Sequence, residues 1–214
     1  MQLRHRGWGA TGLRSGLATR GPCGPLWGRS RPAGPARGVH PLTCRAAAAL
    51  LRWDGGAYLG QEALGQGVDV KVSSWSRMAP NTLPAMAKSA ANYANSALIK
   101  MEALADGYAE GIALDVSGNI SEGSGQNIFM VRDGVIYTPP LGSSILGGIT
   151  RDSVMTLARD LGYPVNESII PRAALYIADE VFFVGTAAEV TPVRSVAKTA
   201  IGARRRGRIP RGLQ

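Results

Sequence analysis

The chain has 214 residues and a net charge of +9 that is unevenly distributed. Nine arginines lie in 1–53 and five in 204–211, and neither stretch contains Lys, Asp or Glu. By contrast, 54–201 holds 10 basic and 15 acidic residues, but neither His nor Cys. The positive charge is therefore weak evidence for a nucleic-acid partner, and a His-based triad, a thiol nucleophile and an ordinary zinc site are excluded from 54–201.

The first segment, 1–52, is rich in Arg, Gly and Pro and shows no helical period, so we expect it to form no core. It is either a mitochondrial or plastid transit peptide or the product of a shifted reading frame. The basic tail 203–214 has the same composition, which favours the second origin and a cytoplasmic protein. The longest uncharged apolar run, Ala46 to Leu51, is far shorter than the ~20 residues that cross a bilayer, so no membrane segment is expected.

Between these ends, hydrophobic periodicity predicts one domain of the α/β (α+β) class without strict βαβ alternation. A loop over 77–84 and turns at 117–119 and 132–134 separate some of its elements. Strands are expected at 67–73, 111–116, 127–131, 135–138, near 165–170 and at 180–185. Helices are expected at 85–105, from about 150 to 161, and at 172–178.

Lys88 stands in a run of small apolar residues within the first turns of the expected long helix. A lysine there either extends its amine to water or is buried with a lowered pKa and acts as a nucleophile. Tyr93 follows at a spacing that would let it reach a shared ligand, although an aromatic side chain at helical spacing more often belongs to a core. These residues alone leave both readings open.

Glu122 enters a glycine-lined bend that leads into a strand, where it is either a solvated loop residue or a carboxylate aimed at a flat ligand. The run 147–150 opens a helix with two glycines and Thr150. This run is either a turn with a helix cap or a phosphate site made by backbone N–H groups and a hydroxyl. Residues 185–188 follow the end of a buried strand and form a second possible phosphate site of the same type.

Taken together, these runs resemble the class IV aminotransferases, and the signature spans 122–151. It reads Glu122-x-Ser124-x-x-Asn127-Ile128-Phe129, then after six residues Ile136-x-Thr138, then after seven Leu146-x-Gly148-Ile149-x-Arg151. Within that class, Pro80-Asn81-Thr82 ahead of Lys88 and the run 185–193 resemble the branched-chain amino acid aminotransferases. The resemblance covers about Trp53 to Gly202 and implies a D-amino-acid-aminotransferase-like, fold type IV cofactor domain over 53–202.

The resemblance implies pyridoxal 5'-phosphate as cofactor and no metal. By family, Lys88 forms the Schiff base with the cofactor and then moves a proton between the substrate Cα and the cofactor. Tyr93 donates to the phenolic oxygen of the cofactor, and Glu122 keeps its pyridine nitrogen protonated.

The resemblance also implies that Ile149, Thr150 and Thr186 bind the phosphate of the cofactor. The backbone of Thr186 and Ala187 is expected to meet the substrate carboxylate. The implied reaction transfers the amino group of leucine, isoleucine or valine to 2-oxoglutarate, and the implied assembly is a homodimer or a higher homo-oligomer with no nucleic-acid or membrane partner.

The main departure from the family is upstream, because its members carry an N-terminal domain of which 1–52 show no trace. We therefore expect a truncated or frame-shifted chain with impaired activity. A D-amino acid or amine transaminase and an aminodeoxychorismate lyase share the same fold and stay open as enzymatic readings, which substrate preference would separate. Two non-enzymatic readings also stand: an inactive remnant that binds cofactor or a partner and, more remotely, a basic nucleic-acid module.

Overall fold

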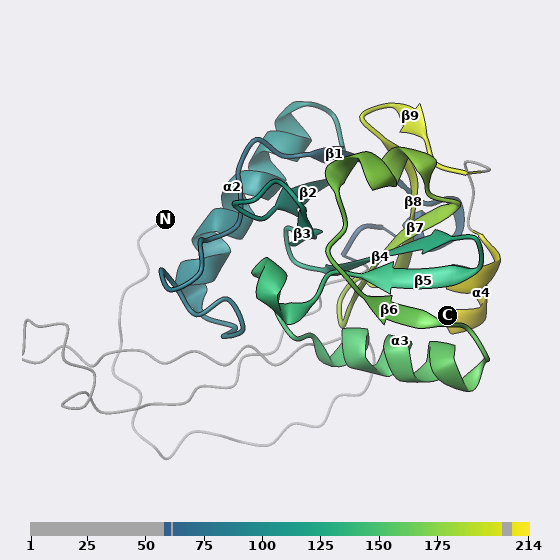
Figure 1. The fold of residues 1–214 in the computed structure, drawn as a ribbon. Helices are drawn as coiled ribbons and strands as arrows, with labels where there is room; N and C mark the ends of the chain where they lie inside the picture. The colour runs from purple at the N-terminus through teal and green to yellow at the C-terminus, as the bar shows by residue number, and fades with distance from the viewer. Residues whose placement is uncertain (1–57, 61, 203–206) are drawn as a thin grey trace, which may run out of the picture.

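The computed structural model describes residues 58–60, 62–202 and 207–214, so the segment 1–52 and the predicted domain start at Trp53 lie outside the described residues (Figure 1). The described residues form one mixed sheet in the strand order β3-β2-β1-β8-β7-β4-β5-β6, with β9 beside β8. The strands are β1 Val68–Val72, β2 Glu110–Leu114, β3 Ile120–Gly123, β4 Asn127–Arg132, β5 Val135–Thr138, β6 Val165–Glu167, β7 Glu180–Gly185, β8 Glu189–Val196 and β9 Thr199–Ala200.

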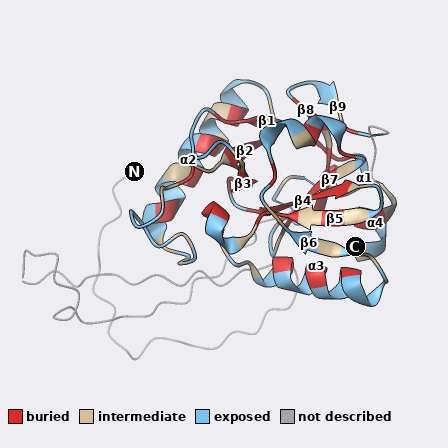
Figure 2. Cartoon of the chain, in the orientation of Figure 1, coloured by how far each residue is buried: buried red, intermediate tan, exposed pale blue. Residues whose placement is uncertain are grey.

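Both parallel and antiparallel pairing occur in the sheet. β1 runs parallel to β2 and β8, and β5 runs parallel to β6, while the remaining strand pairs are antiparallel. The central strands β4 and β7 are buried along most of their length, as the red segments of Figure 2 show. Phe129 and Phe182 stack between them with ring centroids 5.3 Å apart. The predicted α/β class is confirmed.

Two apolar clusters hold the elements together. One contains Val70, Ile112 and Phe183 and is built mainly on β1, β4, β7 and β8. The other contains Phe129 and Phe182 together with Val154 and Met155 of helix α3, Ile149–Asp160. Burial of these side chains is what fixes α3 against the sheet, since each large apolar side chain removed from water contributes roughly 1.5–3 kcal/mol.

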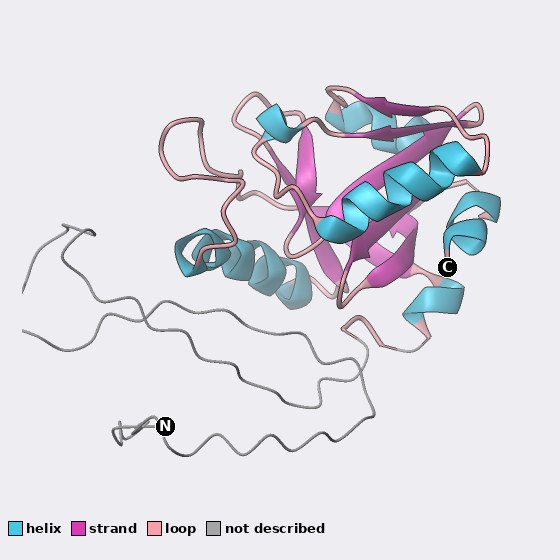
Figure 3. Cartoon of the chain, turned by 90° about the horizontal axis from the view of Figure 1, so that it is seen from below, coloured by secondary structure: helices cyan, strands magenta, loops and turns pink. Residues whose placement is uncertain are grey.

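The longest helix, α2, spans Ala90–Ala105 and lies against β2. Ile99 and Ala103 of this helix are fully buried. The contact depends on Gly111 in β2, because a Cβ at that position would lie 2.7 Å from the Ile99 Cγ2 atom. Viewed from below, the helices, drawn in cyan, lie around the outside of the magenta strands (Figure 3).

Several short helices complete the described residues. They are α1 Ala63–Gln66, the 3-10 helices η2 Leu141–Ser143 and η3 Arg172–Ile177, and α4 Arg208–Leu213. None of the helices over the described part of the chain is long and apolar enough to cross a membrane.

The predicted helix 85–105 is wrong over its first five residues, because α2 begins at Ala90 with the extended Ser89 as its N-cap. Lys88 therefore precedes the helix. Asn92 explains the late start, since its Nδ2 atom donates to the carbonyls of Pro84 and Ala87, both at 2.9 Å. These bonds hold 84–87 in a non-helical path although the local sequence is rich in alanine.

Other differences concern elements that the sequence did not predict. β3 occupies part of the expected bend around Glu122, and β8 and β9 follow β7. The expected strand near 165–170 ends at Glu167, and the expected helix 172–178 is a 3-10 helix. After residue 202 no element was expected, yet α4 packs near β8 and α3 with Ile209 buried.

Candidate functional site

One cavity of about 240 Å³ lies between the start of α2, the β3–β4 turn, the start of α3 and the β7–β8 turn. Its position at the ends of several elements means that residues distant in sequence share one wall. Six residues that the sequence predicted as site residues line it: Lys88, Tyr93, Glu122, Ile149, Thr150 and Thr186. Ala187, the remaining predicted residue, is exposed in the β7–β8 turn and does not line this cavity.

Glu122 is a buried carboxylate in β3, with 5% of the residue exposed, so the reading as a solvated loop residue is wrong. Its Oε1 atom accepts a hydrogen bond from Arg77 Nη2 at 2.8 Å. Its Oε2 atom accepts from Asn127 Nδ2 at 3.2 Å and from the Leu146 backbone N–H at 3.1 Å. Burial raises the pKa of Glu122 to about 7, and the charge of Arg77 acts against that rise.

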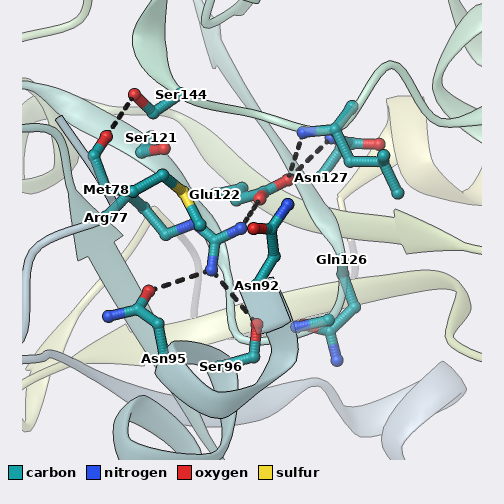
Figure 4. Close-up of polar contacts among 12 residues, drawn as sticks. Arg77, Met78, Asn92, Asn95, Ser96, Ser121, Glu122, Gln126, Asn127 and Ser144 are labelled. Carbon is teal, nitrogen blue, oxygen red and sulfur yellow. Dashed lines mark hydrogen bonds and ion pairs between the residues drawn. The ribbon is translucent and has the colours of Figure 1, made fainter. Parts of the chain in front are cut away.

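Arg77 was not among the predicted site residues. It lines the cavity and is itself 5% exposed. Its Nη1 atom donates to Asn95 Oδ1 at 3.0 Å and to Ser96 Oγ at 3.1 Å, both on α2 (Figure 4). The guanidinium thus stands between α2 and the carboxylate of β3.

Lys88 is exposed and lies at the cavity wall, just before the first residue of α2. Within the described residues its amine makes no hydrogen bond or ion pair. Tyr93 follows one turn into α2, and burial raises the pKa of its hydroxyl, with a further rise from the negative charge of Glu122. The amine, the phenol and the carboxylate therefore meet at one cavity although they come from separate elements.

At the other side of the cavity, α3 begins at Ile149 with Gly148 as an N-cap that has no side-chain hydrogen bond. The first N–H groups of such a helix lack acceptors within the helix and carry the positive end of its dipole. Thr150 Oγ1 and Thr186 Oγ1 lie 3.5 Å apart across this helix end. A Cβ at Gly148 would overlap Asn127 Oδ1, so glycine lets this helix start approach the carboxylate site.

A second buried carboxylate supports the wall formed by the β3–β4 turn. Glu110 is fully buried, and its Oε2 atom accepts from Lys100 Nζ at 3.0 Å and from Gln126 Nε2 at 2.9 Å. Gln126 lines the cavity. No local sequence signal pointed to this set, because its members are 10 and 16 positions apart and meet only in the folded chain.

Comparison with known proteins agrees with this arrangement. The family described as "Amino-transferase class IV" matches residues 43–196. The chain belongs to the class IV aminotransferases. The family predicted from the sequence is thereby confirmed, and with it an enzyme fold of the aminotransferase kind.

Relatives in this family are named branched-chain-amino-acid aminotransferase. One from Salmonella typhimurium is 53% identical over 180 residues, covering 83% of this chain and 58% of the relative. One from Escherichia coli strain K12 is 57% identical over 159 residues, covering 74% of this chain and 52% of the relative. The chain therefore spans about half the length of the curated relatives it matches.

Solved structures show the same likeness. The crystal structure of the Escherichia coli branched-chain amino acid aminotransferase superposes with a TM-score of 0.82 at 52% identity, covering 84% of this chain and 59% of the other. A branched-chain amino acid aminotransferase from T.th., solved with pyridoxamine 5'-phosphate, gives a TM-score of 0.77 at 49% identity, again covering 84% of this chain and 59% of the other.

Proposed function

We propose that this chain carries the cofactor-binding part of a branched-chain amino acid aminotransferase that uses pyridoxal 5'-phosphate. The proposed reaction moves the amino group of leucine, isoleucine or valine to a 2-oxo acid such as 2-oxoglutarate. We further propose that the complete assembly is a homodimer or a higher homo-oligomer. The names of the relatives and the likeness to the T.th. enzyme solved with pyridoxamine 5'-phosphate support this assignment.

The observation that carries the proposal is the gathering of three chemically different groups at one cavity. A lysine amine, a buried carboxylate and a pair of hydroxyls at a helix N-terminus all line it. Their chemistry fits the aldehyde, the ring nitrogen and the phosphate of pyridoxal phosphate. A site for an ordinary sugar or peptide would require no such combination.

When bound, pyridoxal phosphate supplies an aldehyde for the amino group and a ring that accepts the electron pair left at the substrate Cα. Lys88 is the group that we propose bonds to the aldehyde before the substrate does, since it is the lysine at the cavity wall. With cofactor and substrate bound, the same amine would move a proton between the substrate Cα and the cofactor. Its exposure leaves the amine free to move between these tasks.

Glu122 is proposed to hold a proton on the ring nitrogen. Three donors already fix its two oxygens, from Arg77, Asn127 and the backbone of Leu146. A carboxylate offers about four lone-pair sites, so one remains for an N–H donor in the cavity. Because Glu122 is buried, an ionic hydrogen bond to that donor is strengthened by the low surrounding dielectric. Tyr93 is proposed to donate its hydroxyl to the phenolic oxygen.

The start of α3 is proposed as the phosphate site. The backbone N–H groups of Ile149 and Thr150 belong to the first turn of the helix, and the Thr150 and Thr186 hydroxyls flank it. Helix N-termini of this kind bind phosphate through free N–H groups and the helix dipole. The backbone of Thr186 and Ala187, in the β7–β8 turn, is proposed to meet the substrate carboxylate.

An amino-transfer assay tests the proposal. The 214-residue protein is incubated with pyridoxal phosphate, leucine and 2-oxoglutarate, and glutamate formation is followed. Because impaired activity is expected of this chain, we expect slow transfer, which Lys88→Ala abolishes. Lys198→Ala, a change of an exposed lysine in the β8–β9 turn, should leave the slow rate intact. Equal rates for the Lys88→Ala variant and the unchanged protein, or cofactor binding with no transfer from any branched-chain amino acid, would contradict it.

A further inference from the structure

The environment of Glu122 contains a feature that the proposed reaction does not use directly. Arg77, which lies 45 positions earlier in the sequence, forms an ion pair with Glu122 at 2.8 Å between Nη2 and Oε1. Both residues are only 5% exposed. A buried ion pair of this kind contributes less to stability than its geometry suggests, because both charges lose their hydration. Its presence at the cavity therefore calls for a reason other than stability.

The guanidinium of Arg77 is held independently of Glu122. Its Nη1 atom donates to Asn95 Oδ1 and Ser96 Oγ on α2, and the Arg77 backbone N–H donates to the Leu114 carbonyl at the end of β2. Asn95 in turn donates from Nδ2 to the Ser76 carbonyl at 3.0 Å. Arg77 is thus anchored on α2 and on the end of β2 before it reaches β3. Figure 4 shows the two bonds to α2. A side chain fixed in this way has little freedom left to lose when it pairs with a carboxylate.

The other groups around Glu122 provide no comparable charge. Asn127 and the backbone of Leu146 are neutral donors. Tyr93, from α2, is titratable but its phenolate would repel the carboxylate, and Lys88 lines the same cavity without contacting Glu122. Among the described residues, Arg77 is therefore the cation in contact with this carboxylate. Without it, a charged Glu122 would be buried against neutral partners alone, which burial strongly disfavours.

We propose that Arg77 is a positioning residue that favours the charged form of Glu122 and directs its side chain into the cavity before any ligand arrives. The consequence of this role for the ring nitrogen of a bound cofactor rests on the function proposed above. The ion pair itself does not, since it exists among the residues of the chain alone. A preformed anion at this position would bind a protonated ring nitrogen without reorganisation, which is the general advantage of a preorganised site.

Carbon-13 NMR of the cofactor-free 214-residue protein, labelled at the side-chain carboxyl of glutamate, tests the proposal directly. Glu122→Gln identifies the signal. We expect the titration midpoint of Glu122 to rise by about one pH unit or more in Arg77→Gln, the usual effect of removing an adjacent opposite charge. Arg77→Lys should raise the midpoint by less than about half as much as Arg77→Gln does, because the positive charge remains.

Arg151 offers a matched control. It is another buried arginine that pairs with a glutamate, at 2.7 Å from Glu167, but it does not line the cavity. Arg151→Gln should therefore leave the Glu122 midpoint unchanged. An unchanged midpoint in Arg77→Gln would overturn the proposal, as would an equal shift in Arg151→Gln.

If Arg77→Gln does not fold, a titration of the unchanged protein still tests the proposal. The guanidinium nitrogen-15 signals of Arg77 must then change at the same midpoint as the Glu122 carboxyl, and independent behaviour of the two groups would overturn the proposal. Binding of pyridoxal phosphate to the same samples separates the two claims. Loss of binding in every variant and in the unchanged protein would refute the proposed function. The carboxyl titration would still test the effect of Arg77 on Glu122.

Discussion

The buried carboxyl of Glu122 predicts an unusual dependence of stability on pH. Its pKa is about 7 in the folded chain, against an ordinary value of 4.5 for an exposed glutamate. The folded state therefore binds the proton more tightly than the unfolded state. Below pH 4.5 the carboxyl is neutral in both states, and as pH rises from 4.5 to 7 the folded state loses stability relative to the unfolded state. The difference of 2.5 pKa units corresponds to about 3 kcal/mol of lost folding stability, and the whole of this loss is present above pH 7.

Urea unfolding of the unchanged chain and of Glu122→Gln, measured from pH 5 to pH 8, checks this value. We expect the free energy of unfolding of the unchanged chain to fall by about 2–3 kcal/mol relative to the variant over that range. The carboxyls of Asp69 and Glu102 do not interfere, because their pKa values are lowered and they titrate below the range. Parallel curves for the two proteins would refute the assignment of a raised pKa to Glu122.

Three further changes test other parts of the site. Thr186→Val should weaken binding of pyridoxal phosphate about tenfold or more, because a hydrogen bond to a charged group is lost, and should leave binding of phosphate-free pyridoxal unchanged in equilibrium dialysis. Gly148→Ala should lower the thermal midpoint of unfolding by several degrees, because the added Cβ displaces Asn127. Gly142→Ala should not lower it, because its added Cβ meets nothing within 4 Å. Equal midpoints for the two variants would contradict the close approach of Gly148 to Asn127. Asn92→Ala should destabilise the chain by about 1–3 kcal/mol and speed amide exchange in the segment before α2, and unaltered exchange there would show that the two carbonyl bonds do not hold it.

Much of the sheet could be predicted from the sequence because its strands carry local signals. β5 and β7 were predicted with the bounds that the structure shows, since each contains an apolar run, 135–137 or 181–184. The start of α2 was not predictable in the same way. The alanines ahead of Ala90 favour a helix locally, and the bonds from Asn92 that prevent it are visible only in the folded chain.

The candidate site shows the same division. Glu122 and Thr150, which line the cavity, were found from the glycine runs beside them and from the resemblance to the class IV aminotransferases. Arg77 was missed because a single arginine in a loop has no periodic or spacing signal. The helix α4 was missed because its six residues include a proline and a glycine, both of which disfavour a helix. Ile209 and Leu213, four positions apart, gave only a weak signal for an apolar face.

The central claim is that Lys88 is the lysine that bonds to pyridoxal phosphate. Borohydride reduction of the 214-residue protein mixed with the cofactor, followed by peptide mass spectrometry, tests it most directly, because reduction makes the bond between lysine and cofactor permanent. We expect the pyridoxyl group on the peptide that contains Lys88, with no labelling of that peptide in Lys88→Ala and unchanged labelling in Lys198→Ala. Equal labelling spread over Lys71, Lys100 and Lys198, or a specific label on any lysine other than Lys88, would contradict the account.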